Sequence, residues 1–314
     1  MASAVFREVR AFAPGSVGNV GPGLDILGLA IEGAGDRVTA RVADAPGISV
    51  TTSGNERIPT DPGRNTAALA ARAVLRLAGA SHIGLALTVE KGLPLSGGQG
   101  GSAASAVAAA VAVNHLLGRP LAFPALLLAT LEAEEAVAGR HLDNLAPSLL
   151  GSAVLIRSME PLDYVVLPVP DALRVVLVRP EQELRTAEGR AVLPASIDRA
   201  TAMHQAAQVA AMVAALASGD LSLLGRAIDD RIAEPARAPL LPGFTEAKAA
   251  ALAAGGLGCS ISGSGPTAFA LVATEAIGER VARAMTQAYE RLGLSTSIRI
   301  AAVDRVGARV EHAS

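Results

Sequence analysis

The sequence predicts an α+β protein built from two domains that share a cleft. With 314 residues, the chain is longer than one ordinary small domain. Hydrophobic residues make up 51% of it and charged residues 18%, so a large core can form and general disorder is excluded. Strand-like and helix-like patterns are mixed along the whole chain, and a boundary near residue 158 gives the domains 1–158 and 159–314.

The first domain is expected to mix strands with buried helices. Residues 36–54 alternate and are rich in β-branched side chains, which predicts two strands joined by a turn at Ala45-Pro46-Gly47. Residues 65–80 have the spacing of an amphipathic helix that ends at a glycine. A strand over 83–94 leads into a glycine-rich loop. Two helices follow, the first apolar nearly all round and therefore buried, over 102–120 and 124–139.

The second domain is expected to combine strands and helices in several alternations. Strand-like segments open it at 151–158, 163–170 and 173–180. Helical patterns then cover 196–216, 221–230 and 244–254. A strand, a helix and a strand close the chain over 267–274, 278–293 and 295–303.

Composition excludes several classes of partner. The formal net charge is −2 and there is no basic block, so the chain has no electrostatic footprint for nucleic acid or an anionic membrane. Lys91 and Lys248 are the only lysines, which makes arginine the expected contact for an anionic ligand. Cys259 is the only cysteine, so no intramolecular disulfide can form. The first residues lack a signal-peptide pattern and no membrane-spanning apolar run occurs, so we expect a cytoplasmic protein.

The loop "PLSGGQGGSAA", residues 94–104, is the strongest functional signal. Glycines allow a tight turn that brings several N–H groups to one point, and at a helix start these donors add to the helix dipole and favour phosphate. A flexible surface turn with a capping serine is the alternative, and the buried helix that follows argues against it. The Walker motif G-x-x-x-x-G-K-S/T and the nucleophile elbow G-x-S-x-G are both absent.

This loop resembles the ATP-binding motif of the GHMP kinases, usually P-x-x-x-G-L-G-S-S-A-A. Gln99 and Gly101 stand where that family usually has leucine and the first serine. Two further motifs resemble the homoserine kinase branch of the family, "APGSVGNVGPGLDILGLAI" and "GLGCSISGSGPTAFAL". Three more segments do so too, "HLDNLAPSLLGS", "RTAEGRAVLP" and "AEPARAPLLPGF". The six occur in order between about residues 8 and 300, so the chain is identified as a member of this family.

The resemblance implies a two-domain GHMP kinase fold. Its N-terminal domain would be ribosomal protein S5 domain 2-like, its C-terminal domain ferredoxin-like, and the active site would lie between them. The implied reaction is ATP-dependent phosphorylation of the L-homoserine hydroxyl, with ATP and Mg²⁺ as cofactors, in threonine biosynthesis. A homodimer is possible by the same resemblance.

The resemblance also assigns the nucleotide and metal contacts. Ser102 and Glu134 are implied for magnesium, which usually takes only one or two protein carboxylates. A solvated helix face beside Glu132 and Glu135 is the alternative for Glu134. For Asn65, an N-cap of the following helix is an equally good interpretation. The implied ATP-binding residues are Pro94, Gly97, Gly98, Gly100, Gly101, Ser102, Ala103 and Asn65.

The acceptor site is implied in the same way. Arginine suits two-point recognition of a carboxylate, and an amino-acid substrate also needs an acceptor for its ammonium group. Asn144 and Ser102 are implied as catalytic residues, and Asp143 stays open as an alternative base. The implied substrate-binding residues are Asn19, Asp25, His141, Asn144, Arg190 and Arg237.

Two other functions stay open at this point. A mevalonate-type kinase of the same superfamily is one, although mevalonate has no ammonium group for Asp25 to bind. A catalytically silent nucleotide-binding relative is the other, and Gln99 and Gly101 are its best support. Intact Ser102, Glu134 and Asn144 argue against the silent relative.

Overall fold

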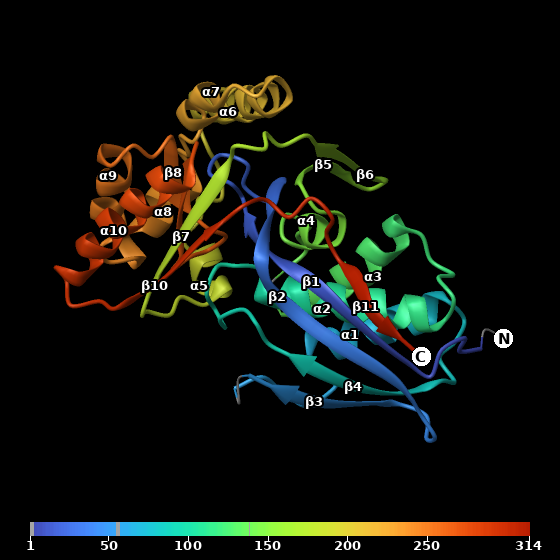
Figure 1. Ribbon diagram of the computed structural model, residues 1–314. Coiled ribbons are helices and arrows are strands. Elements are labelled where there is room, and N and C mark those ends of the chain that lie inside the picture. The colour runs from blue at the N-terminus through green and yellow to red at the C-terminus, as the bar shows by residue number, and fades with distance from the viewer. Residues whose placement is uncertain (1–2, 55–56, 138) are drawn as a thin grey trace.

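The strands form two separate sheets, each covered by helices, in the computed structural model of the chain (Figure 1). The structure describes residues 3–54, 57–137 and 139–314. The first sheet has seven strands in the order β11-β1-β2-β4-β3, and the hairpin β5-β6 pairs with β2. Its strands are β1 (Glu8–Gly18), β2 (Leu27–Ala43), β3 (Ile48–Ser53), β4 (Gly84–Glu90), β5 (Ala153–Met159), β6 (Leu162–Leu167) and β11 (Arg309–Ala313).

Helix α2 (Gly101–Leu116) is the centre of the first domain. Its sequence is mostly alanine and valine, so it has no polar face, and most of its side chains are buried. It packs on β1 and β2 and against three other helices, which confirms the predicted buried helix. Those helices are α1 (Thr66–Leu77), α3 (Phe123–Glu135) and α4 (Leu145–Leu150).

The second sheet is antiparallel throughout, in the order β10-β7-β9-β8. Alternate residues of β7 enter different cores, Val176 and Val178 under α9 (Phe244–Ala253) and α10 (Glu275–Glu290), and Val175 and Leu177 on the opposite face. Both faces are therefore covered, and the strand order is that of the predicted ferredoxin-like fold. The strands are β7 (Arg174–Pro180), β8 (Gly258–Ile261), β9 (Ala268–Val272) and β10 (Thr296–Ala301).

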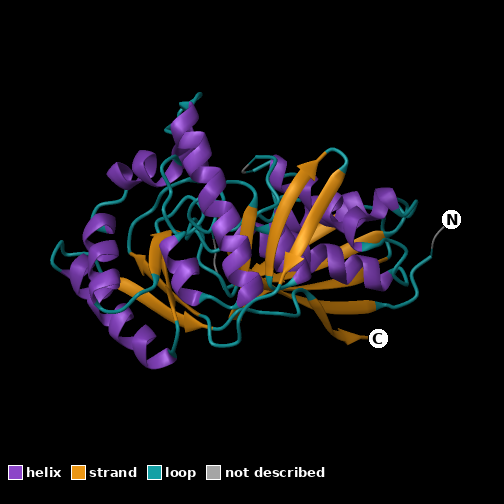
Figure 2. Ribbon diagram, turned by 90° about the horizontal axis from the view of Figure 1, so that it is seen from above, coloured by secondary structure: helices purple, strands orange, loops and turns teal. Residues whose placement is uncertain are grey.

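Several helices connect these strands, and the longest of them, α6, is prominent when the molecule is seen from above (Figure 2). The predicted helix 221–230 ends early, at Arg226, because the Asp230 carboxylate accepts from the N–H groups that begin a separate short helix, α8 (Ala233–Arg237). None of the helices in the described ranges has the length and apolar character needed to cross a bilayer. The helices are α5 (Thr186–Ala191), α6 (Arg199–Ser218), α7 (Leu221–Arg226), α8 (Ala233–Arg237), a 3-10 turn (Ala238–Leu240), α9 (Phe244–Ala253) and α10 (Glu275–Glu290).

The chain crosses between the two domains more than once. The predicted division between residues 158 and 159 falls at the end of β5, inside the β5-β6 hairpin, whose two strands pair with each other. Strand β11 returns to the first sheet and pairs with β1, so the last strand of the chain lies beside the first (Figure 1). We therefore propose that the hairpin and residues 309–313 belong with the first domain.

Candidate active site

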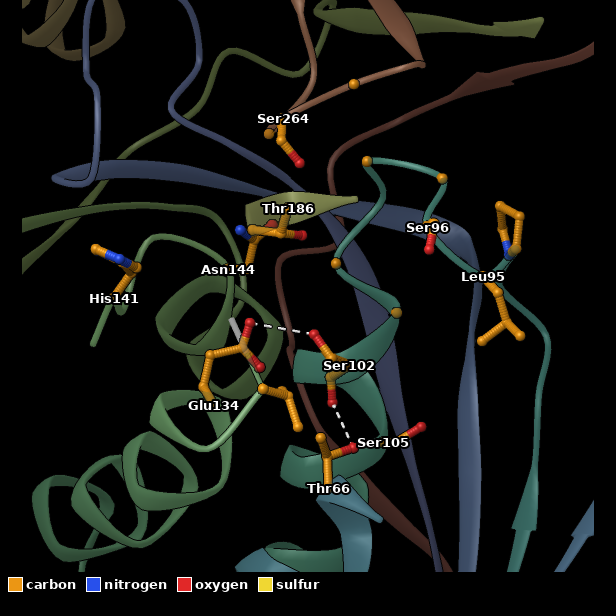
Figure 3. Close-up of a pocket in the computed structure, with 18 of the residues that line it drawn as sticks. Thr66, Leu95, Ser96, Ser102, Ser105, Glu134, His141, Asn144, Thr186 and Ser264 are labelled. Carbon is orange, nitrogen blue, oxygen red and sulfur yellow. Dashed lines mark hydrogen bonds between the residues drawn. The ribbon is translucent and has the colours of Figure 1, made fainter. Parts of the chain in front are cut away.

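A cavity of about 340 Å³ lies where the two domains meet. This volume falls at the lower end of the range of small-molecule sites. Both domains contribute to its walls, and several of the lining side chains are drawn in Figure 3. The predicted site residues that line it are Asn19, Asn65, Pro94, Gly97, Gly98, Gly100, Gly101, Ser102, Glu134, His141, Asn144, Arg190 and Arg237.

The glycine-rich loop enters α2 through backbone conformations that require glycine. Gly98 and Gly100 have φ values of +69° and +67°, in the left-handed region. A Cβ on Gly98 would lie 2.4 Å from the Ser262 carbonyl oxygen, and one on Gly100 would lie 2.2 Å from Ser16 Oγ. Gly100 is the N-cap of α2 and offers no side-chain cap, so the N–H groups of the first helical turn stay available to an anion.

The second domain holds the loop from the other side. Ser262 Oγ donates to the Gly98 carbonyl at 2.5 Å, and the Thr267 hydroxyl donates to the Gly97 carbonyl. Gln99, which departs from the family motif, is buried and donates from Nε2 to Thr267 Oγ1 at 3.3 Å. The loop is therefore shaped by both domains together.

Glu134 and Ser102 point toward each other in the cavity (Figure 3). Ser102 Oγ donates to Glu134 Oε1 at 3.1 Å, while Oε2 is buried with no hydrogen-bond partner. Burial raises the pKa of Glu134 to about 7, and the Ser102 hydrogen bond opposes this. The alternative of a solvated helix face is wrong for Glu134, which is 7% exposed, whereas Glu132 and Glu135 are exposed.

The buried, unpaired Oε2 of Glu134 and the neighbouring Ser102 hydroxyl can supply two oxygen ligands to a cation. Hard oxygen donors are what Mg²⁺ prefers, and it usually completes its shell with phosphate oxygens and water. Within the described ranges, no cluster of three or more His, Cys, Asp and Glu side chains could hold a metal by itself. Residues Ser102 and Glu134 therefore fit a magnesium ion that arrives with a nucleotide.

A charged cluster lies on the other side of the cavity. Arg190 donates from Nη2 to Asp25 Oδ1 at 2.7 Å and from Nη1 to Asp25 Oδ2 at 3.3 Å. His141 Nδ1 lies 3.4 Å from Asp25 Oδ1. Burial lowers the pKa of His141, although Asp25 opposes the shift. Asp25 does not itself line the cavity, but it contacts Arg190 and His141, which do.

Arg237 is the largest fully buried side chain of the described part of the chain, and its exposed fraction is 2%. Its Nε donates to the Gly189 carbonyl and its Nη1 to the Gly263 carbonyl, both at 2.9 Å. Burial lowers the pKa of Arg237, and the nearby Arg190 adds to this shift. A second guanidinium therefore lies beside Arg190, held by backbone carbonyls rather than by a carboxylate.

Asn144 lies between the loop and the charged cluster. Its Oδ1 accepts from Ser16 Oγ at 2.9 Å, and Ser16 N donates to the Gln99 carbonyl at 3.2 Å. Asp143 Oδ2 accepts from Asn19 N at 3.0 Å and from Asn144 Nδ2 at 3.4 Å. Burial, with the nearby Asp25, raises the pKa of Asp143 to about 6. Ser16 thus connects the orientation of Asn144 to the loop.

Two predicted nucleotide contacts, Ala103 and Asn65, have structural roles in helices. Ala103 is fully buried within α2 and is not among the cavity-lining residues. Asn65 lines the cavity and is also the N-cap of α1, since its Oδ1 accepts from Ala67 N at 3.0 Å and Ala68 N at 3.2 Å. The N-cap interpretation of Asn65 is therefore confirmed.

The proteins that this chain resembles agree with this geometry. The family model "GHMP kinases N terminal domain" matches residues 65–152, and "GHMP kinases C terminal" matches residues 212–291. A homoserine kinase of Arabidopsis thaliana is 46% identical to the chain over 98% of this chain and 85% of the relative. The chain belongs to the homoserine kinase family of the GHMP kinases.

Other relatives agree with this membership. A homoserine kinase of Chlorobium phaeobacteroides is 42% identical, with 97% of this chain and 99% of the relative covered. The crystal structure of homoserine kinase from Cytophaga hutchinsonii superposes with a TM-score of 0.92 at 38% identity, over 98% of both chains. An L. major mevalonate kinase, with a TM-score of 0.72 and 16% identity over 96% of this chain and 99% of that chain, shares the fold alone. The predicted family and fold class are confirmed.

Several cavity residues of this homoserine kinase family member were not singled out from the sequence. Thr186 stands inside "RTAEGR", so motif membership was the available signal. Ser16, which orients Asn144 and does not itself line the cavity, stands inside the quoted first motif. Lys91 had no signal beyond its rarity, because its partners come from distant parts of the chain.

Replacing Asn65 by alanine separates its two roles. Loss of the N-cap is expected to lower the free energy of unfolding by about 1 kcal/mol, measured by urea denaturation. Thr274→Ala is the matched control, because Thr274 caps α10 in the same way at a distance from the cavity. Both variants should lose stability, and only Asn65→Ala should raise KM for ATP; equal KM values in both would leave Asn65 with a capping role alone.

Proposed function

We propose that this chain transfers the γ-phosphoryl group of ATP to the hydroxyl of L-homoserine, giving O-phospho-L-homoserine and ADP. The single observation that carries the proposal is one cavity with a phosphate-type loop on one side and the Arg190–Asp25 and Arg237 cluster on the other. The first side suits a nucleotide and the second suits a zwitterionic amino acid. Membership of the homoserine kinase family supports the same substrate pair.

The loop residues bind the phosphates in this scheme. The N–H groups at the start of α2, which follows Gly98 and Gly100, have no side-chain cap. They place partial positive charge beside the phosphoryl group that is transferred. Phosphoryl transfer needs little covalent help from a protein, so positioning and electrostatic stabilisation supply most of the catalysis.

Glu134 and Ser102 hold magnesium in this scheme. When bound, the ion neutralises the negative charge of the phosphates. Glu134 must be deprotonated for this role, and its partner Ser102 keeps Oε1 oriented while Oε2 stays available.

The acceptor binds through complementary charges. Arg190 and Arg237 take the carboxylate of homoserine, and arginine's planar fork allows two-point contact. Asp25 contacts the cavity-lining Arg190 and His141 and supplies negative charge near the ammonium group, and its backbone N–H is fixed by Asn19 Oδ1 at 3.0 Å. His141, which contacts Asp25, helps to close this end of the site.

Asn144 positions the hydroxyl that attacks. Its amide is oriented by Ser16 on one side and Asp143 on the other. Because Asp143 Oδ2 already accepts from Asn19 N, we assign Asp143 to holding the local geometry. The hydroxyl proton then passes to an oxygen of the transferred phosphoryl group, so the step needs no dedicated protein base.

Release of ADP from ATP and magnesium tests the proposal, with L-homoserine and mevalonate supplied in parallel. Turnover with homoserine alone is the expected result. Turnover with mevalonate would contradict the assigned roles of Arg190, Arg237 and Asp25. Nucleotide binding without turnover of either alcohol would indicate a silent relative.

Affinity for magnesium–ATP is expected to rise with pH. Because the pKa of Glu134 is raised to about 7, this carboxyl is largely protonated at about pH 6 and largely ionised at about pH 8. The dissociation constant should fall by up to about tenfold per pH unit below the pKa and level off above it. Calorimetric titration of the wild type measures this, and a Glu134→Gln variant should show a flat profile; a flat wild-type profile would contradict the role of Glu134.

The same carboxyl makes the free protein less stable as the pH rises. Its folded pKa of about 7 lies above the ordinary value of 4.5, so the folded state binds the proton more tightly than the unfolded chain does. The protonated form therefore contributes stability below about pH 4.5, and this contribution is lost as the pH rises through about 7. The difference between the wild type and Glu134→Gln in urea denaturation should shrink toward low pH.

A further inference from the structure

A buried charge cluster lies directly beneath the first turn of α2. The Lys91 ammonium group, at the end of β4, pairs with Asp36 of β2, and the exposed fractions of the two side chains are 4% and 0%. Lys91 Nζ also donates to the Gly101 carbonyl at 2.7 Å and to Ser105 Oγ at 3.0 Å. The cluster thus connects the end of β4, the strand β2 and the start of α2.

Every polar atom of this cluster is satisfied. An ammonium group has three N–H donors, and Lys91 uses them on Asp36, Gly101 and Ser105. Asp36 accepts from Ser105 Oγ at 2.6 Å through Oδ2 and from Gly92 N at 3.1 Å through Oδ1. Lys91 therefore has no free donor for a phosphate, even though it lines the cavity.

The cluster lies where it can fix the end of the glycine-rich loop. A buried ion pair is a weak source of stability, because removing two charges from water offsets most of their attraction. This pair, however, fixes the carbonyl of Gly101, the first residue of α2, whose N–H groups face the phosphates in the proposed function. A Cβ on Gly101 would lie 3.3 Å from Lys91 Nζ, so the ammonium group packs closely against the loop's end.

We propose that Lys91, held in place by Asp36, is a positioning residue that sets the affinity of the glycine-rich loop for magnesium–nucleotide. The proposal rests on the proposed function only in that the loop binds a nucleotide, and it does not depend on which alcohol is phosphorylated. Lys91 acts through the Gly101 carbonyl and Ser105, and does not touch the phosphates.

The chain offers a matched control in Lys248, its only other lysine. Lys248 pairs with Glu234, and Ser260 Oγ donates to Glu234 Oε2 at 2.6 Å, so a second Lys–acid–Ser cluster exists away from the loop. A residue that acts only by adding stability would behave like Lys248. A positioning residue would also change nucleotide binding.

Three variants test the proposal: Lys91→Met, the double variant Lys91→Met with Asp36→Asn, and Lys248→Met. The double variant leaves no unpaired buried charge, so it keeps the test valid if Lys91→Met alone fails to fold. Binding of magnesium–ADP is measured by calorimetry, stability by thermal unfolding, and KM for each substrate by ADP release. Because calorimetry with ADP needs no acceptor, it is informative even if homoserine proves not to be the substrate.

The expected result is a split between stability and affinity. The double variant should regain most of the melting temperature lost in Lys91→Met, yet bind magnesium–ADP at least about tenfold more weakly than the wild type, with KM for homoserine unchanged. Lys248→Met should lose stability and keep its nucleotide affinity. Wild-type affinity in the double variant, or an equal loss in Lys248→Met, would overturn the proposal.

Discussion

Replacing Glu134 by alanine is expected to lower kcat/KM by about 100-fold to 1000-fold, because the variant loses the carboxylate that Ser102 contacts and that holds magnesium in the proposed function. The Mg²⁺ concentration needed for half-maximal activity should rise in the same variant. Steady-state ADP release at several Mg²⁺ concentrations measures both effects.

The neighbouring Glu135 provides the control for this experiment. It lies on the same helix, α3, and is exposed, so Glu135→Ala should leave the magnesium dependence as in the wild type. Removing the buried Glu134 also removes an unsatisfied oxygen, so the variant should fold. Unchanged magnesium dependence in Glu134→Ala would refute the assignment of this carboxylate.

Replacing Arg237 by alanine is expected to raise KM for homoserine by about 30-fold or more, with KM for ATP little changed. Truncating one partner of a buried charged contact typically costs about 2–5 kcal/mol, which corresponds to such a factor. Arg237→Lys should recover only part of the loss, because lysine lacks the planar fork. ADP release at varied concentrations of each substrate separates the two KM values.

The control for Arg237 is Arg226→Ala, since Arg226 is an exposed arginine of α7 in the same domain. Arg237 also donates to two backbone carbonyls, so thermal unfolding of each variant shows how much of the effect is structural. If KM for ATP and for homoserine rise together in Arg237→Ala, the side chain shapes the whole cavity and is not specific for the carboxylate.

Features that depend on local pattern could be predicted from the sequence. The apolar run of α2 shows directly that the helix has no solvent face, and the glycines before it show a strained loop. The family motifs then named most of the residues that the fold brings to one cavity. Arg190 and Arg237 are examples, since they lie close together only after folding.

Features that depend on distant partners could not be predicted. Glu134 stands between two exposed glutamates, and nothing local distinguishes it; its burial follows from the packing of α3 beside α2, which carries Ser102. The first strand, β1, carries glycine and proline and is buried on both faces at its end, so it shows no alternation. Gln99 differs from the motif, yet its side chain turns to Thr267, a contact that only the tertiary structure reveals.

The pairing of β11 with β1 has a consequence for biosynthesis. Residues 309–313 complete the edge of a sheet whose other strands lie within residues 8–167, so this partner of β1 is translated after every other strand of the sheet. Until it emerges from the ribosome, β1 presents an unpaired edge, which is a template for pairing with other chains. A contact of such sequence separation also closes slowly. We expect a nascent chain stalled before residue 309 to depend on chaperones more than the released protein does.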